Sequence, residues 1–322
     1  ATIEIRDDYG ELVVKEETDS NGEIEAFYLP VGKYYFKETV APDGYILNES
    51  KFSFEILPSG KVKGTTEITN APTEVIITKS DLTTGQPLPG ATIEIKDASG
   101  KIVFKEVSGP NGEVKAFKLP VGKYTFTETA APDGYVRAPE SFEFEIYPDG
   151  KIRGDCTITN RPTEVVITKR DLTSGLPLPG ATIEIKNATG AVVFHDVSDS
   201  NGEIKAFKLP VGKYTFTETA APDGYIRTPE TFEFEILPDG RVTGDCTITN
   251  RPTEVVITKK DITNAQPLPG AIIQIVDING NLAFEGKTDT NGVVKAFKLS
   301  SGKYTFREIS APDGYMINEE SF

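Results

Sequence analysis

Short stretches of this chain alternate between apolar and polar residues, and turn residues separate one stretch from the next. Residues 181–186 read ATIEIK and residues 231–237 read TFEFEIL, so nearly every second side chain is apolar in each. A period of two is typical of a β-strand with one buried face. No helical period of useful length appears, and the pattern therefore predicts an all-β chain.

The same stretches recur along the whole sequence. ATIEI begins at Ala1, Ala91 and Ala181, each 90 positions after the last, and the related AIIQI follows at Ala271. A fixed period of this length indicates tandem structural repeats. The expected domains are residues 1–72, 73–161, 162–251 and 252–322, called repeats 1 to 4 below. Repeat 1 lacks the opening segment of the others and repeat 4 lacks the closing one, so we interpret the chain as a fragment of a longer array.

Each complete repeat is expected to contain about seven short strands. In repeat 3 they are predicted near residues 164–170, 181–186, 191–197, 203–209, 212–219, 231–237 and 242–250. Asn201-Gly202 is expected to form a tight hairpin turn, and Thr189-Gly190 and Pro238-Asp239-Gly240 mark further turns. This number and spacing of strands predict two packed antiparallel sheets in each repeat.

Composition narrows the class of protein. An apolar fraction of 38% with evenly spread charges is typical of folded modules. A net charge of −15 argues against nucleic-acid binding and against binding to an anionic membrane surface. No segment approaches the roughly 20 apolar residues of a membrane-spanning helix. Contact with nucleic acid or membrane is therefore not expected of these residues.

Candidate metal ligands are scarce. Cys156 and Cys246 occupy the same repeat position, one in each complete repeat, so neither repeat can close an internal disulfide. Both are interpreted as small buried fillers. The single histidine, His195, is expected on the surface of a strand. The sequence predicts no metal site and no cofactor.

Three polar residues interrupt the buried faces of the predicted strands. In repeat 3, Lys169, Glu218 and Asn250 each end an apolar stripe and are expected to point inward. The equivalents in repeat 2 are Lys79, Glu128 and Asn160. A buried charge is costly unless it is paired or neutralised. From the alternation alone, the three could react, form an unreacted hydrogen-bonded group, or lie at strand ends open to water.

Several motifs resemble one known family. VVITKRDLTSGLPLPGATIEI, YTFTETAAPDGY and TITN, in this order in repeat 3, are similar to the collagen-adhesin B-type domain, also called Cna-B or SpaA-like, of Gram-positive surface proteins and pilins. The resemblance covers all four repeats. It implies tandem immunoglobulin-like or prealbumin-like antiparallel β-sandwiches.

The resemblance also implies a role for the inward-pointing residues. In that family the lysine forms a spontaneous isopeptide bond with the asparagine, and the glutamate assists. These roles would fall to Lys79, Glu128 and Asn160, and to Lys169, Glu218 and Asn250. Repeat 1 retains Glu38 and Asn70 without a lysine, and repeat 4 retains Lys259 and Glu308 without an asparagine, so neither is expected to cross-link internally.

The expected function is structural. Burial favours a neutral amine beside a neutral acid, and folding supplies the proximity for a single self-modifying reaction, so no enzyme activity is expected. We interpret the repeats as the stalk of an extracellular, wall-attached adhesin, with neighbouring repeats as partners and a host matrix protein bound by a tip domain. One alternative is that the repeats bind a matrix ligand themselves, although their loops are nearly identical. Another is that they form part of a pilus shaft.

Overall fold

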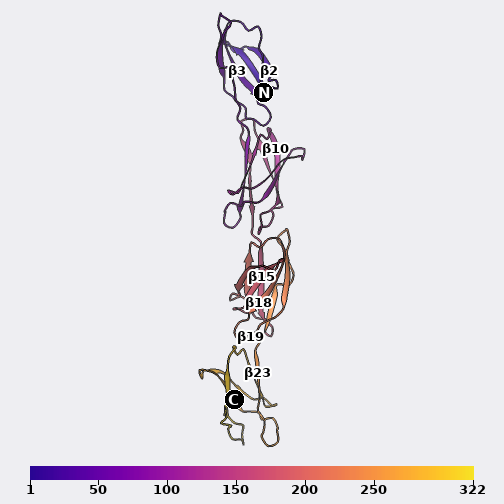
Figure 1. Cartoon of the computed structure of the whole chain (residues 1–322), viewed down its shortest axis with the longest axis vertical. Coiled ribbons are helices and arrows are strands. Elements are labelled where there is room, and N and C mark those ends of the chain that lie inside the picture. Colours follow the sequence, from indigo (N-terminus) through magenta and orange to yellow (C-terminus); the bar gives the residue numbers. More distant parts are fainter. The chain divides into compact units, whose positions relative to one another are not determined.

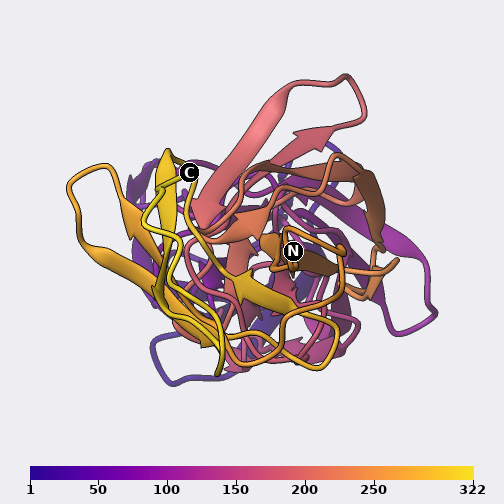
Figure 2. The same cartoon turned by 90° about the horizontal axis from the view of Figure 1, so that it is seen from below.

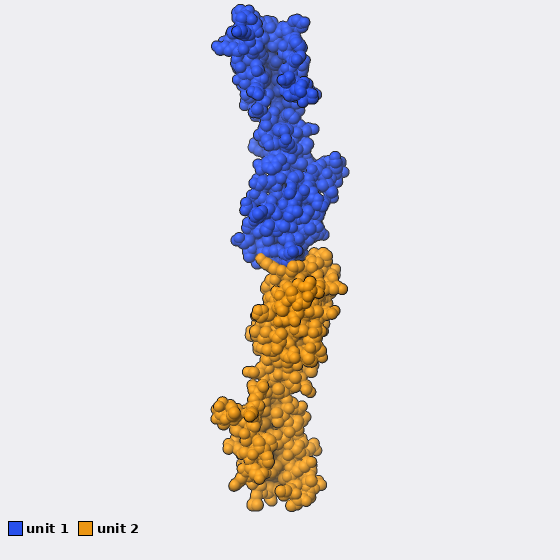
Figure 3. Space-filling view, in the orientation of Figure 1, with its two compact units in different colours: residues 1–162 blue, residues 163–322 orange.

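The computed structural model describes residues 1–322, and every regular element in it is a β-strand (Figure 1). The predicted all-β class is confirmed. No helix long and apolar enough to cross a membrane is present. The chain divides into two compact units, residues 1–162 and 163–322, which Figure 3 colours separately.

Repeat 3 folds as two sheets that face each other. The first has the strand order β17-β14-β22-β19 and the second has the order β16-β15-β18-β20-β21. The strands of the first sheet are β14 (Glu164–Asp171), β17 (Glu203–Phe207), β19 (Tyr225–Ile226) and β22 (Thr247–Pro252). Those of the second are β15 (Thr182–Asn187), β16 (Val192–Val197), β18 (Gly212–Ala220), β20 (Thr231–Ile236) and β21 (Val242–Thr243). Only β14 and β22 pair in parallel, and the other neighbours are antiparallel.

Repeat 2 has the same arrangement. Its sheets have the orders β13-β6-β9 and β12-β11-β10-β7-β8, and β13 pairs in parallel with β6. The strands are β6 (Glu74–Asp81), β7 (Thr92–Asp97), β8 (Ile102–Val107), β9 (Glu113–Phe117), β10 (Gly122–Ala130), β11 (Ser141–Ile146), β12 (Ile152–Gly154) and β13 (Thr157–Asn160). In both repeats, then, the opening strand lies beside the closing one.

Repeats 1 and 4 contain parts of this arrangement. Repeat 1 has one sheet, β2-β1-β3-β4-β5, made of β1 (Thr2–Asp7), β2 (Leu12–Glu17), β3 (Gly32–Val40), β4 (Phe52–Ile56) and β5 (Val62–Gly64). Repeat 4 pairs β23 (Glu254–Thr258) with β26 (Val293–Phe297). Its other sheet contains β24 (Ile272–Asp277), β25 (Leu282–Lys287) and β27 (Tyr304–Ser310).

The core of repeat 3 follows the predicted alternation. Ile183 and Ile185 of β15 are fully buried, and Phe216 of β18 and Ile236 of β20 lie in the same sheet and belong to the same core. Tyr214 stacks on Phe234 with ring centroids 5.2 Å apart. Burying large side chains at every second position stabilises the sandwich, because each removes apolar surface from water.

The Asn201-Gly202 turn differs from its prediction. It joins β16 to β17, which belong to different sheets, so it is a crossing between sheets and not a hairpin. The amide of Gly202 donates to Asp199, which closes the turn locally. The turn predicted at Thr189-Gly190 is present and forms a hairpin that joins β15 to β16, in salmon in Figure 2.

The last predicted strand, residues 242–250, is also different: it is divided into β21 and β22. Gly244 interrupts it with a φ of 111°, a value that side chains other than glycine rarely adopt. A Cβ at Gly244 would lie 2.5 Å from the carbonyl oxygen of Glu233. The chain therefore leaves one sheet at this glycine and enters the other at Thr247.

Candidate functional site

The strands of repeat 3 bring Lys169, Glu218 and Asn250 together. Lys169 points inward from β14, and Asn250 lies on the adjacent parallel strand β22, where Lys169 pairs with Ile248 and Asp171 with Asn250. Glu218 reaches them from β18 in the facing sheet. The relative exposures of the three residues are 0%, 1% and 0%, so none of them lies at a solvent-exposed strand end.

The carboxyl group of Glu218 lies between the other two side chains. Its Oε1 is 3.6 Å from Nζ of Lys169. Its Oε2 accepts hydrogen bonds of 2.7 Å from Nδ2 of Asn250 and from the amide of Thr228. Nδ2 of Asn250 also donates to the carbonyl of Ile226 at 2.7 Å, so the orientation of the carboxamide is fixed from two sides.

Three polar atoms of this site have no hydrogen-bond partner. They are Nζ of Lys169, Oε1 of Glu218 and Oδ1 of Asn250, all of them buried. Buried polar atoms are nearly always hydrogen-bonded in folded proteins, because leaving one unpaired costs about 1–3 kcal/mol. Three such atoms in one site are therefore unusual.

Repeat 2 reproduces the site. Nζ of Lys79 lies 3.5 Å from Oε1 of Glu128, and Nδ2 of Asn160 donates to Oε2 of Glu128 at 2.8 Å. The amide of Ala138 donates to the same oxygen at 2.7 Å, and the carbonyl of Val136 accepts from Asn160 at 2.6 Å. The lysine, one carboxyl oxygen and the carboxamide oxygen again have no hydrogen-bond partner.

Burial changes the acidity of both lysines. It lowers the pKa of Lys79 and of Lys169, because a desolvated ammonium is disfavoured, and the nearby glutamate opposes this only in part. A lower pKa increases the fraction of neutral amine, which is the nucleophilic form.

Repeats 1 and 4 each hold part of the site. In repeat 1, Nδ2 of Asn70 donates to Oε2 of Glu38 at 2.6 Å. In repeat 4, Nζ of Lys259 donates to Oε2 of Glu308 at 3.0 Å, and the lysine side chain is 20% exposed. Two members of the site thus meet in each of these repeats.

The other candidate residues lie apart from this site. Cys156 and Cys246 were predicted to be small buried fillers; both pack against the core, but they are only partly buried. Burial nevertheless raises the pKa of both thiols. His195 is exposed on β16, as predicted. No three His, Cys, Asp or Glu side chains gather in a way that could hold a metal ion.

Sequence reasoning missed the groups that support the site from the loop after β18. Besides the Thr228 amide and the Ile226 carbonyl, the hydroxyl of Tyr225 donates to Oδ2 of Asp171 at 2.7 Å. Asp171 is two positions beyond Lys169, so it shares the inward face of β14. The spacing of two residues from Lys169 along one strand is the sequence signal that could have predicted an inward-pointing Asp171.

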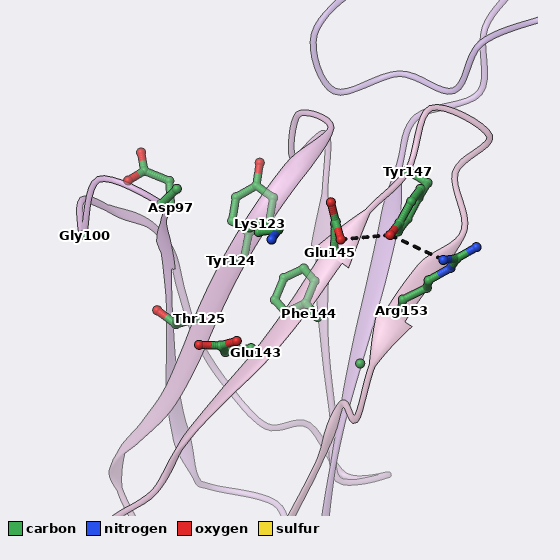
Figure 4. Close-up of a pocket in the computed structure, with 12 residues that line it drawn as sticks. Asp97, Gly100, Lys123, Tyr124, Thr125, Glu143, Phe144, Glu145, Tyr147 and Arg153 are labelled. Atoms are coloured by element: carbon green, nitrogen blue, oxygen red, sulfur yellow. Dashed lines mark hydrogen bonds between the residues drawn. The ribbon is translucent and has the colours of Figure 1, made fainter.

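A hollow on the surface of repeat 2 is separate from the site (Figure 4). Asp97 and Lys123 line it together with a chain of side chains in which Tyr147 donates to Glu145 and Arg153 donates to Tyr147. None of the three site residues of repeat 2 lines this groove. It therefore offers no access to the buried chemistry.

The fold and the site define a class of modular domain: a β-sandwich repeat in which a lysine on the first strand and an asparagine on the last strand meet a glutamate from the facing sheet. The chain belongs to the SpaA prealbumin-like fold domain family, whose model matches residues 1–72, 73–162, 163–252 and 253–322. The resemblance drawn from the sequence motifs is confirmed.

Among named relatives, a trypsin-resistant surface T6 protein of Streptococcus pyogenes is 35% identical over 69 residues, which are 21% of this chain and 13% of that protein. The Bacillus anthracis TIE protein matches 99% of this chain and 63% of its own at 26% identity, with a TM-score of 0.44. The major pilin subunit BcpA of Bacillus cereus matches 77% of this chain and 93% of its own at 20% identity, with a TM-score of 0.32. The chain thus spans less than two thirds of the T6 and TIE proteins.

Proposed function

We propose that these repeats are structural segments of a Gram-positive surface protein, in a pilus-like role, and that each complete repeat closes itself with a covalent bond. The bonds join Lys79 to Asn160 and Lys169 to Asn250. The observation that carries this proposal is the buried lysine nitrogen without a hydrogen-bond partner, next to a carboxyl group that also holds the carboxamide.

The reaction is an amide exchange. Nζ of Lys169 attacks Cγ of Asn250, a bond forms between these atoms, and the bond from Cγ to Nδ2 breaks. Glu218 has one oxygen facing each nitrogen, so its carboxyl group takes up the proton that Nζ gives up and passes this same proton on to Nδ2. Ammonia leaves, and the carboxyl group returns to its starting state. Effective molarities of about 10⁵ M or more in well-oriented pairs make such a slow exchange feasible.

The reaction occurs once in each complete repeat and has no external substrate, so we do not propose an enzyme. The names of the relatives, a surface T protein and a pilin, support a place on the outside of the cell. We propose wall attachment and a stalk role, with neighbouring repeats as partners and matrix binding left to a tip domain. A pilus shaft is the alternative that the pilin relative favours, and matrix binding by the repeats themselves is a further one.

The intact mass of the full chain tests the cross-links. The wild type is expected to lie below the mass calculated from its sequence by two molecules of ammonia. Glu218→Gln should lie below its own calculated mass by one molecule of ammonia. The double variant Glu128→Gln with Glu218→Gln should have its calculated mass. Glu308→Gln changes the matching glutamate of repeat 4, where no asparagine completes the site, and should still lose two. A wild type at its calculated mass would overturn the proposal.

A further inference from the structure

Repeats 3 and 4, which lie in one compact unit, meet at the loop between β18 and β19 (Figure 1). The amide of Thr253 donates to the carbonyl of Gly224 at 2.9 Å. Its hydroxyl lies 3.2 Å from the same carbonyl and donates to Leu299 at 2.7 Å. Thr253 therefore connects the loop of repeat 3 to the turn of repeat 4 that follows β26.

That turn has an unusual backbone. Lys298 has a φ of 62°, in the left-handed region that costs a residue other than glycine about 1 kcal/mol or more. Its backbone lies so close to the loop of repeat 3 that a Cβ at Gly224 would be 2.6 Å from the Lys298 carbonyl oxygen. The contact therefore requires both the left-handed lysine and a glycine opposite it.

The side chain of Lys298 continues across the same contact. Its Nζ lies 3.1 Å from Oδ2 of Asp171 and 5.2 Å from the centre of the Tyr225 ring. The Asp171 side chain is 3% exposed and the Lys298 side chain is 54% exposed. Burial opposes ionisation of Asp171, but hydrogen bonds from Tyr225, Thr173 and Lys298 outweigh it and hold its pKa below the usual range. Repeat 3 thus presents a buried anion, and repeat 4 supplies the cation.

The backbone part of this contact recurs between repeats 1 and 2, in the other compact unit. The amide of Thr73 donates to the carbonyl of Gly44 at 3.0 Å, and Lys118 has a φ of 59°. A Cβ at Gly44 would lie 2.5 Å from the Lys118 carbonyl oxygen, and Nζ of Lys118 lies 5.2 Å from the Tyr45 ring. The close approach of a loop glycine to a left-handed lysine, with the lysine over the tyrosine ring, is therefore a recurring feature of the chain.

Both halves of the contact keep their form where they are not docked. Tyr28 takes the position of Lys298 in repeat 1 and has a φ of 59° although it is fully exposed. In repeat 4, Gly314 has a φ of 85° with open space around it, and Tyr315 donates to Asp261 at 2.9 Å. Because the turn and the loop are preformed, little conformational entropy is lost on docking.

We propose that the Asp-Gly-Tyr loop of a repeat, together with the aspartate that follows its buried lysine by two positions, is a receptor for the left-handed lysine turn of another repeat. The glycine recognises the partner by shape, because only a residue without a Cβ leaves room for the backbone of the lysine turn. The aspartate recognises it by charge, because its carboxylate pairs with the lysine ammonium. The contact acts as an ionic lock that holds two successive repeats in one orientation. It does not depend on the isopeptide bonds.

Amide hydrogen exchange in the full chain tests the lock, with the Thr253 amide as the reporter. Lys298→Met keeps the side-chain stem but removes the charge, and should speed exchange of Thr253 roughly three- to ten-fold. Lys295→Met is the matched control, because Lys295 pairs with Glu254 within repeat 4 at 2.8 Å, and it should leave Thr253 unchanged. Added salt should speed exchange in the wild type and have little effect in Lys298→Met.

A second pair of variants tests the shape. Gly224→Ala and Gly314→Ala place the same side chain in the same loop, at φ values of 81° and 85°, but only the first meets a neighbouring repeat. Gly224→Ala should speed Thr253 exchange, and Gly314→Ala should not. The Thr288 amide, bonded to Ala271 within repeat 4, shows whether that repeat stays folded. Thr253 exchange within two-fold of the wild type in both Lys298→Met and Gly224→Ala would overturn the proposal.

Discussion

Lys169 shows how complete burial alters the chemistry of a residue that is usually found at protein surfaces. Its ammonium would be desolvated, with only Glu218 nearby to compensate. Breaking such a buried pair typically costs about 3–5 kcal/mol, because a charge is then left without a partner. An isopeptide bond would remove the difficulty, since an amide nitrogen does not carry a titratable charge.

Asn250→Ala should therefore make the stability of repeat 3 depend on pH. The variant cannot form the bond, so Lys169 stays a free amine whose pKa is lowered by burial. Between this lowered value and the ordinary lysine value of about 10.4, the unfolded chain binds more protons than the folded one, and the free energy of unfolding rises with pH. The urea midpoint of repeat 3, followed through the Ile248 amide signal, should rise as the pH increases toward the ordinary lysine pKa of about 10.4. The cross-linked wild type should lack this rise, and parallel curves for the two proteins would contradict the prediction.

The alternation of the sequence predicted which way the three site residues point, because strand parity fixes the face of each side chain. It could not predict that Oε2 of Glu218 holds the carboxamide or that the Ile226 carbonyl orients it. Those contacts depend on how two sheets face each other and on the path of a loop without regular periodicity. Asp171 was overlooked because an aspartate near a strand end is usually interpreted as solvent-exposed.

Among the elements, the crossing turn at Gly202 has a direct bearing on the site. A Cβ at Gly202 would overlap the backbone carbonyl of Lys169, and Gly202 itself has a φ of 68°. The same carbonyl accepts from the amide of Leu178, and the amide of Lys169 donates to Gly202. The turn therefore holds β14 in place at Lys169.

Gly202→Ala should destabilise repeat 3 more than Gly190→Ala. Both glycines have positive φ, 68° and 83°, so both variants lose about 1 kcal/mol to backbone strain. Gly190 has open space around it, whereas Gly202 abuts β14, which adds about 1–3 kcal/mol of overpacking. Urea unfolding of repeat 3 measures the difference, and intact mass should show incomplete ammonia loss only for Gly202→Ala. Equal midpoints would show that the turn does not support β14.

The strands themselves were largely predictable, and the errors have a common cause. Asn201-Gly202 is a strong local turn signal, but whether a turn joins partners in one sheet depends on distant pairing, here of β17 with β14. The division of residues 242–250 at Gly244 has the same origin, since the glycine is needed where the chain passes close to Glu233. Local periodicity carries no information on either contact.

At the scale of the whole molecule, the proposed bonds determine which parts of the chain can extend. Each closes a loop of about 80 residues, which by the chain-entropy estimate for disulfides stabilises a repeat by about 4.5 kcal/mol. Unlike a disulfide, the amide is not reduced by thiols. A force applied to the ends would pass from Lys169 to Asn250 without unravelling the strands between them.

Single-molecule stretching of the full chain should show this directly. In the wild type, repeats 2 and 3 should give no unfolding extension from the residues inside the bonds. Glu218→Gln should add one event that releases about 80 residues, or roughly 270 Å of chain at ~3.4 Å per residue. Glu308→Gln serves as the control and should add none. A wild type that already shows two such events would contradict the cross-linked state.

The 90-residue period, which recurs in four repeats, was the most informative feature of the sequence, because aligning the repeats places the same motifs at equivalent positions. The contact between successive repeats was not predicted from it. Nothing in the local pattern marks Lys298 as left-handed, because lysine has no preference for that conformation. The need for a glycine at Gly224 likewise becomes visible only when the next repeat is in place.

The parallel pairing of β14 with β22 has a mechanical consequence of its own. Because neighbouring parallel strands run the same way, the entry of a repeat at Glu164 and its exit at Pro252 lie at opposite ends of the paired segment. Tension would then load the two strands in shear, so that all their hydrogen bonds carry the force at the same time. In an antiparallel pair pulled from one end, the hydrogen bonds would instead break one after another. Even before any cross-link forms, such a repeat would yield abruptly and at high force.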